Sequence, residues 1–172
     1  MPGAMARPAI VRREPGVRLV WHYTSWATLP RIVAAGRLLP GDAQDPGETP
    51  MLWFSARQDW EPTATAQVAD GAQPRMLTLQ EHRRRFGCVR FGLPGGDPRL
   101  APWELACRAA GMGLTRRRKL EAWSRQAGAN PADWFGTSQA IPLMGLRFQV
   151  LLDEWGEGDM SAMARLWTEK RG

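Results

Sequence analysis

The stretch LVWHYTSWATLPRIVAAGRLLPGDAQDPGETPMLWFS, residues 19–55, decides the fold of this chain. An apolar run from Val17 to Trp21 has the composition of a short buried strand and ends at His22. A second apolar run, from Met51 to Phe54, ends at Ser55. If the two strands lie side by side, His22 and Ser55 face the same cleft, so we expect both side chains at one site.

A helix is expected between these strands. Its apolar positions recur at helical spacing and are Leu29, Ile32 and Val33. Either Ser25 or Thr28 can cap its start, and Gly36 can supply the left-handed residue that ends it. The predicted unit is therefore a strand, a polar corner, a helix and a turn. The following residues 40–50 are rich in turn formers and predict a loop at the edge of the cleft.

These residues resemble the NAD-binding core of ADP-ribosyltransferases of the poly(ADP-ribose) polymerase and diphtheria-toxin type. Proteins of that family carry a strand ending in Trp-His-Gly-Thr, a helix of pattern Leu-x-x-Ile-x-x-x-Gly-Leu and a later strand reading Tyr-Phe-Ala. The corresponding residues here are Trp21-His22-Tyr23-Thr24, then Leu29, Ile32, Gly36 and Leu38, then Trp53-Phe54-Ser55. The family's third signature is a glutamate that opens a late strand pair, and its best match is Gln139.

The resemblance implies a fold, a ligand and a set of roles. The fold is α+β, with a split, mainly antiparallel sheet and peripheral helices, and the ligand is NAD, used as a substrate without a metal. In this comparison His22 holds a ribose hydroxyl, and the backbone of Tyr23 binds the nicotinamide carboxamide. The other implied site residues are Thr24, which supports the corner, Trp53, in place of the family's tyrosine, Ser55, a partner of the carboxamide, and Trp60, the ring that stacks on nicotinamide.

The carboxylate of the family site has no direct counterpart. Cleavage of the glycosidic bond of NAD develops positive charge on the ribose, which a nearby carboxylate stabilises. Gln139 can donate and accept hydrogen bonds, but it carries no charge. Glu61, near the expected stacking helix, and Glu154, after the last strand, are the alternative carboxylates. The candidate catalytic residues are therefore His22, Gln139 and Glu61.

The rest of the chain favours the same class of fold. Residues 1–16 mix proline, glycine and arginine without periodicity and predict a loose tail, followed by one ADP-ribosyltransferase-like domain over residues 17–172. Strands outnumber helices and do not alternate with them regularly, which favours α+β over βαβ. Further helices are expected from Asp59 through Val68, from Pro102 to Ala110, from Thr115 to Gln126 and from Met160 to Lys170.

Composition and net charge indicate which kinds of ligand and partner the protein binds. The net charge of +6 comes almost wholly from arginine and favours anionic partners, either NAD or a nucleic acid, or an acidic protein docked on the basic surface. The two cysteines and two histidines match no zinc spacing. The sequence shows no membrane-spanning stretch and no signal peptide, so the cytoplasm is the default compartment, although export by another route would look the same.

Three functions stay open at this point. The first is a transferase, either a mono-ADP-ribosyltransferase or an NAD-cleaving toxin or modifier, whose acceptor is a protein or a nucleic acid. The second is a non-catalytic binder of NAD or ADP-ribose, which Gln139 favours. The third is a basic nucleic-acid-interaction module, which the runs Arg83–Arg85 and Arg116–Lys119 favour. Taken singly, His22, Trp53 and Ser55 are also typical of a core histidine, a core tryptophan and a cap.

Overall fold

The computed structural model describes residues 17–43, 45–71 and 73–170, and the predicted tail over residues 1–16 lies outside them. The strands are β1 (Leu19–Thr24), β2 (Arg37–Leu38), β3 (Leu52–Ser55), β4 (Gln67–Asp70), β5 (Gln73–Met76), β6 (Val89–Pro94), β7 (Ala101–Pro102), β8 (Trp134–Thr137), β9 (Ile141–Pro142), β10 (Arg147–Leu151) and β11 (Trp155–Glu157). The helices are α1 (Leu29–Ala35), α2 (Leu79–Phe86), α3 (Trp103–Ala110), α4 (Leu114–Gln126) and α5 (Met160–Glu169), with 3-10 turns at Trp26–Thr28, Pro62–Ala64 and Pro131–Asp133.

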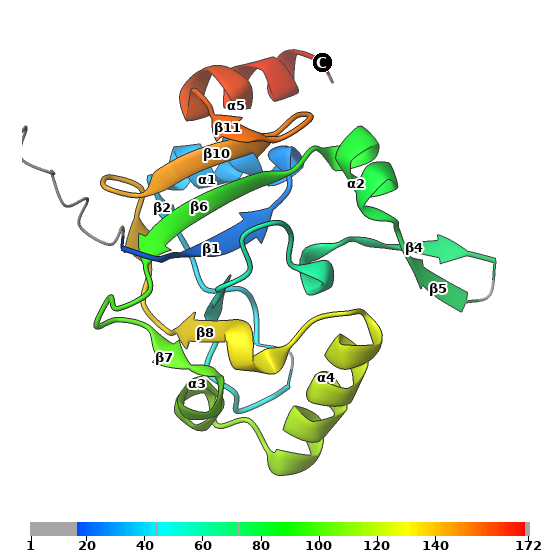
Figure 1. Ribbon diagram of the computed structural model, residues 1–172, viewed down its shortest axis with the longest axis vertical. Coiled ribbons are helices and arrows are strands. Elements are labelled where there is room, and N and C mark those ends of the chain that lie inside the picture. Colours follow the sequence, from blue (N-terminus) through cyan, green and yellow to red (C-terminus); the bar gives the residue numbers. More distant parts are fainter. Residues whose placement is uncertain (1–16, 44, 72, 171–172) are drawn as a thin grey trace, which may run out of the picture.

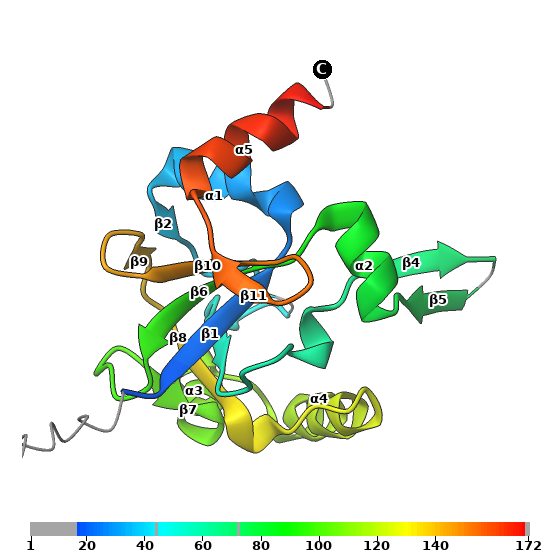
Figure 2. The same cartoon turned by 45° about the horizontal axis from the view of Figure 1, so that its top comes forward.

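Within the described residues, seven strands form one sheet in the order β11-β10-β6-β1-β3-β8-β7, and every neighbouring pair is antiparallel. Helices α1 and α5 lie together on one side of the molecule, whereas α3 and α4 lie at the opposite end, beside β7 and β8 (Figure 1). The hairpin of β4 and β5 extends away from the sheet in both views (Figure 2). The α+β class and the mainly antiparallel sheet are confirmed.

Strand β1 lies at the centre of the sheet and has two unequal neighbours. It pairs with β6 over its whole length, from Leu19 opposite Pro94 to Thr24 opposite Val89. Its pairing with β3, which confirms the predicted adjacency of the two strands, is recorded at Trp21 opposite Ser55 alone. Past that point the two strands have no paired residues, and the side chain of His22 bonds to the β3 backbone there.

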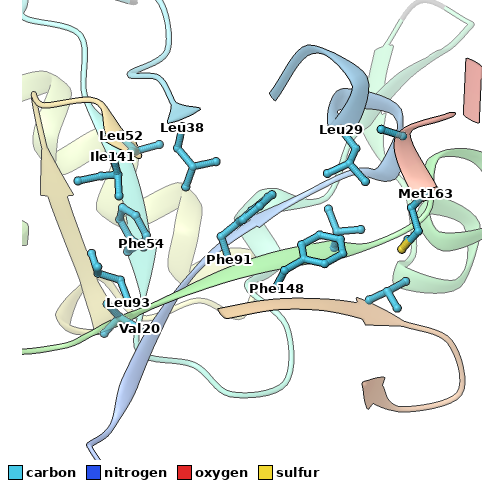
Figure 3. Packing of buried hydrophobic residues seen from close by; sticks show 13 residues of the cluster. Val20, Leu29, Leu38, Leu52, Phe54, Phe91, Leu93, Ile141, Phe148 and Met163 are labelled. Atoms are coloured by element: carbon cyan, nitrogen blue, oxygen red, sulfur yellow. The ribbon is translucent and has the colours of Figure 1, made fainter. Parts of the chain in front are cut away.

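The main core is an apolar layer between the sheet and helices α1 and α5. Four of its residues come from four elements: Phe54 from β3, Phe91 from β6, Leu29 from α1 and Met163 from α5. Their side chains are buried in one cluster (Figure 3). Trp26, in the turn before α1, ties this end of α1 to α5 by donating a hydrogen bond from Nε1 to the carbonyl oxygen of Met163, at 2.7 Å. This layer supports one face of β1 and β3, since residues of both strands belong to it.

The helix predicted after the first strand is confirmed, although the predicted side-chain cap does not form. Gly36 ends α1 in the left-handed conformation, with φ of 65°, as expected. Thr28 occupies the cap position, but its hydroxyl donates to the carbonyl oxygen of Ser25 and does not cap the helix. The hydroxyls of Thr24 and Thr28 lie 2.9 Å apart, so Thr24 supports the corner between β1 and α1.

The helix expected from Asp59 through Val68 is wrong. Only a 3-10 turn forms at Pro62–Ala64, and the chain then enters the β4–β5 hairpin. The reason is tertiary: Trp60 is drawn into a second apolar cluster, where its Nε1 donates to the hydroxyl of Thr65 at 2.9 Å. Thr65 has an extended backbone, which ends the turn. Buried packing of Trp60 thus outweighs the local helix signal.

His82 predicts that stability depends on pH. This residue of α2 is buried, and its Nδ1 accepts a hydrogen bond from the backbone N–H of Ala66 at 2.9 Å, so the ring must be neutral to keep the bond. Burial lowers the pKa of His82 below its ordinary value of 6.5. The unfolded chain therefore binds a proton more readily, and the free energy of unfolding should fall as the pH drops below about 6.5.

Urea unfolding between pH 5 and 8 checks this expectation. His82→Gln keeps a hydrogen-bond acceptor but does not titrate, so its stability should depend less steeply on pH over this range than that of the wild type. Equal slopes for the two proteins would contradict the role assigned to His82. The remaining slope comes from His22, whose pKa burial also lowers, and near pH 5 from carboxyl groups whose pKa hydrogen bonds lower, such as Glu121 and Glu157.

Candidate functional site

A cavity of 320 Å³ opens between the β1–β3 pair and helix α4. Strands β1 and β3 and the turn that follows β3 supply one wall, whereas α3, α4 and β8 supply the other. The lining residues of the first wall are Trp21, His22, Tyr23, Trp53, Phe54, Ser55, Glu61, Thr63 and Ala64. Those of the second are Trp103, Met112, Arg116, Leu120, Trp123 and Trp134. As the sequence predicts, His22 and Ser55 line the same cavity.

His22 is held in one tautomer by the backbone of β3. Its Nδ1 lies 2.9 Å from the carbonyl oxygen of Trp53, and because a carbonyl oxygen only accepts, Nδ1 carries the proton. Burial lowers the pKa of His22 more than this hydrogen bond raises it, so the ring is neutral at pH 7. In a neutral ring bonded in this way, Nε2 is a hydrogen-bond acceptor. It has no protein partner among the described residues, which leaves it available to a ligand.

Glu61 is fixed by short hydrogen bonds from its neighbours. Ser55 donates its hydroxyl to Oε2 at 2.8 Å, and Thr63 donates its hydroxyl to Oε1 at 2.8 Å and its backbone N–H to the same oxygen at 3.3 Å. Both Ser55 and Glu61 are buried, at 2% and 6% exposed. All three bonds are donated to the carboxylate, which suits an ionised acceptor. The arrangement therefore holds a carboxylate rigidly at the cavity.

Tyr23 and Arg90 stiffen the wall behind the cavity. The hydroxyl of Tyr23 donates to the carbonyl oxygen of Arg57 at 2.6 Å and accepts from Arg90 at 3.2 Å. Arg90 is buried with its guanidinium over the rings of Trp21, at 3.9 Å, and Trp155, at 4.2 Å. Burial raises the pKa of Tyr23 to about 12, so its phenol stays neutral and serves as part of the wall.

The opposite wall is aromatic. The ring of Trp103 lies 5.3 Å from that of Trp53 and 5.0 Å from that of Trp134, measured between centroids. Gly136 permits this packing, because a Cβ there would come within 2.7 Å of the Trp53 ring. Nε1 of Trp134 is buried without a hydrogen-bond partner among the described residues. The tryptophans of three elements thus converge on one space from different directions.

Ion pairs hold α4 over the cavity. Arg117 contacts Glu104 of α3 at 2.7 Å and Glu121 of α4 at 2.8 Å. Arg116 contacts Asp45 at 2.7 Å and Glu48 at 3.0 Å, in the loop before β3. Half of the basic run on this helix is therefore already matched by carboxylates of the same chain, which weakens the case for a nucleic-acid surface there.

The structure brings together five of the residues predicted for the site. His22, Tyr23, Trp53, Ser55 and Glu61 line the cavity. Trp60 does not, because its ring fills the second apolar cluster beside Trp155. Thr24 lies at the β1 corner. Gln139 is exposed, two residues beyond β8, and is not among the lining residues, so its contact with a ribose stays a prediction. Glu154, in the turn before β11, is exposed as well.

Sequence reasoning missed the residues of the second wall. They are Met112, Leu120, Trp123 and Trp134, together with Trp103 and Arg116. The helical spacing of Trp103 in α3, and of Leu120 and Trp123 in α4, indicated core positions, and nothing local shows that these helices face a cavity. The one available signal was the excess of tryptophan, since five of the nine tryptophans in the chain line this space.

Comparison with known proteins adds no assignment, since no protein-family model, no curated protein and no solved structure matches this chain significantly. Among the described residues, no group of histidine, cysteine and acidic side chains is arranged to hold a metal ion. In the same part of the chain, no helix is long and apolar enough to cross a membrane. The site must therefore be interpreted from its own geometry.

Proposed function

We propose that this protein is an NAD-binding, ADP-ribosyltransferase-like protein that transfers a single ADP-ribose unit or cleaves NAD, as a toxin or modifier would. The observation that carries the proposal is the shared cavity of His22, Trp53 and Ser55. These residues belong to the segments that resemble the family, and they line one space with a buried carboxylate, Glu61.

The size and walls of the cavity suit the nicotinamide end of NAD. Its volume of 320 Å³ lies at the lower end of the usual range for ligand pockets, which supports a ring and its ribose more than a whole dinucleotide. Trp53 and Trp123 line the cavity without being fully buried and can contact a flat ring, and Nε2 of His22 can accept a hydrogen bond from a ribose hydroxyl. The remainder of NAD would extend out of the cavity.

In this proposal Glu61 supplies the charge that Gln139 lacks. When the bond between the ribose C1′ and the nicotinamide nitrogen breaks, the electron pair leaves with nicotinamide and positive charge develops on the ribose. A fixed carboxylate beside that carbon stabilises the charge without having to reorganise. Glu61 is buried, immobilised by Ser55 and Thr63, and lines the cavity, whereas Gln139 is exposed outside it.

A second candidate is a binder of NAD or ADP-ribose that does not cleave it. Both oxygens of Glu61 already accept hydrogen bonds from the protein, which favours a structural role for this carboxylate. Release of nicotinamide separates the two candidates, because only the transferase produces it. Thermal stabilisation by NAD is expected of both, since a ligand that binds only the native state raises apparent stability.

His22→Ala is expected to weaken NAD binding by about tenfold, because it removes one hydrogen bond to the ligand. The folded state should persist, since the main apolar layer does not include His22. Calorimetric titration with NAD measures the affinity, and circular dichroism checks the fold. Glu169→Gln, an exposed change at the end of α5, is the control. Unchanged affinity in His22→Ala would contradict the assignment.

A further inference from the structure

We propose that the cavity selects flat ligands that carry a positive charge, and that it therefore distinguishes the pyridinium ring of oxidised NAD from a neutral ring of the same shape. The inference concerns the same cavity as the proposed function and, in naming NAD, rests on it. Its physical basis is separate: one buried negative charge without a cation, and a set of aromatic faces without a cation.

The negative charge is that of Glu61. Its hydrogen-bond partners, Ser55 and Thr63, are neutral, and among the described residues no lysine or arginine forms an ion pair with it. A buried carboxylate is costly unless a positive charge compensates it. The arginine that also lines the cavity, Arg116, is already engaged by Asp45 and Glu48. A cationic ligand would supply the missing partner.

The aromatic faces point to the same ligand. This fold already uses tryptophans to hold a cation, because the guanidinium of Arg90 lies 3.9 Å from the centroid of Trp21 and 4.2 Å from that of Trp155. Three other tryptophans that line the cavity, Trp53, Trp123 and Trp134, are not fully buried and carry no arginine or lysine over their rings in the described part of the chain. Among the aromatic side chains, tryptophan attracts a cation to its ring face more strongly than tyrosine or phenylalanine does.

Together, the aromatic rings and the buried carboxylate that line this cavity form a binding site for a cation that the protein itself does not supply. A neutral ring would gain the stacking alone, whereas a pyridinium ring would gain both the attraction of the aromatic faces and that of the carboxylate. After cleavage of NAD, the released nicotinamide is neutral and loses both of these attractions, so that only the stacking remains. The same feature that favours the substrate would thus weaken the product and assist its release.

Two small ligands test the inference on the unmodified protein. Nicotinamide is neutral, and 1-methylnicotinamide adds a permanent positive charge to nearly the same shape. Calorimetric titration should show that 1-methylnicotinamide binds about tenfold more tightly than nicotinamide. Glu61→Gln should abolish most of this ratio while nicotinamide binding persists, and Glu169→Gln, which alters an exposed carboxylate on α5, should leave the ratio unchanged.

The outcomes separate this inference from the proposed function. Equal affinities for the two ligands, or no binding of either, would overturn the inference even if NAD were cleaved. A clear preference for 1-methylnicotinamide with no binding of NAD would support the inference and overturn the proposed function. If Glu61→Gln fails to fold, the ligand pair on the wild-type protein still decides, because that comparison needs no variant.

Discussion

Replacing Glu61 by glutamine is expected to lower the rate of nicotinamide release from NAD by about a hundredfold, which corresponds to about 3 kcal/mol of lost charge stabilisation in the transition state. The substitution keeps the size of the side chain and one acceptor for Ser55 or Thr63, but it removes the only charge that the first wall of the cavity supplies among the described residues. Release of nicotinamide measured at saturating NAD reports the effect.

The matched control is Glu169→Gln, because Glu169 is exposed at the end of α5 and does not line the cavity. It should keep the wild-type rate. The role assigned to Glu61 would be contradicted by a Glu61→Gln protein that is folded, binds NAD and releases nicotinamide as fast as the wild type. In that case another group, with Gln139 first, would carry the chemistry.

Arg90→Leu is expected to lower the free energy of unfolding by about 3 kcal/mol. The guanidinium of Arg90 donates to Gln149, to the backbone of Gln58 and to Tyr23, and it lies between two tryptophan rings. Leucine fills part of the space between the rings but leaves these acceptors without their donor. Urea unfolding monitored by tryptophan fluorescence measures the change.

Arg84→Leu makes the same chemical change on the exposed side of α2 and should cost less than about 0.5 kcal/mol. A cost for Arg90→Leu that is no larger than this would show that the stacked guanidinium does not support the wall. Because Arg90 lies behind Trp21 and Tyr23, the variant should also weaken NAD binding by displacing these two residues of the cavity.

The first wall of the cavity was predictable because its determinants are local. Two apolar runs identify β1 and β3, and the polar residues that follow these runs, His22 and Ser55, fall at the site once the strands pair. The predicted end of the first strand is wrong, because pairing with β6 continues β1 past His22 to Thr24. The helix between them is marked by its own spacing and by Gly36, which ends it. Each of these signals lies within a short stretch of the sequence.

The second wall was not predictable, because it depends on contacts between distant segments. The position of α4 over the cavity is set by ion pairs of Arg116 and Arg117 with residues of α3 and of the loop before β3. Likewise, the burial of Trp60 replaces an expected helix with a single turn and places Glu61 at the cavity. A sequence pattern gives the type of an element, but not the partner it packs on.

The most direct test of the NAD assignment is an experimental structure of the protein determined with saturating NAD. We expect the nicotinamide ring inside the cavity, near Trp53 and Trp123, with Nε2 of His22 about 3 Å from a ribose hydroxyl and Glu61 on the side of the ribose C1′. The account would be contradicted if NAD bound elsewhere on the protein, or if the cavity stayed empty at a concentration of NAD that saturates an ADP-ribosyltransferase.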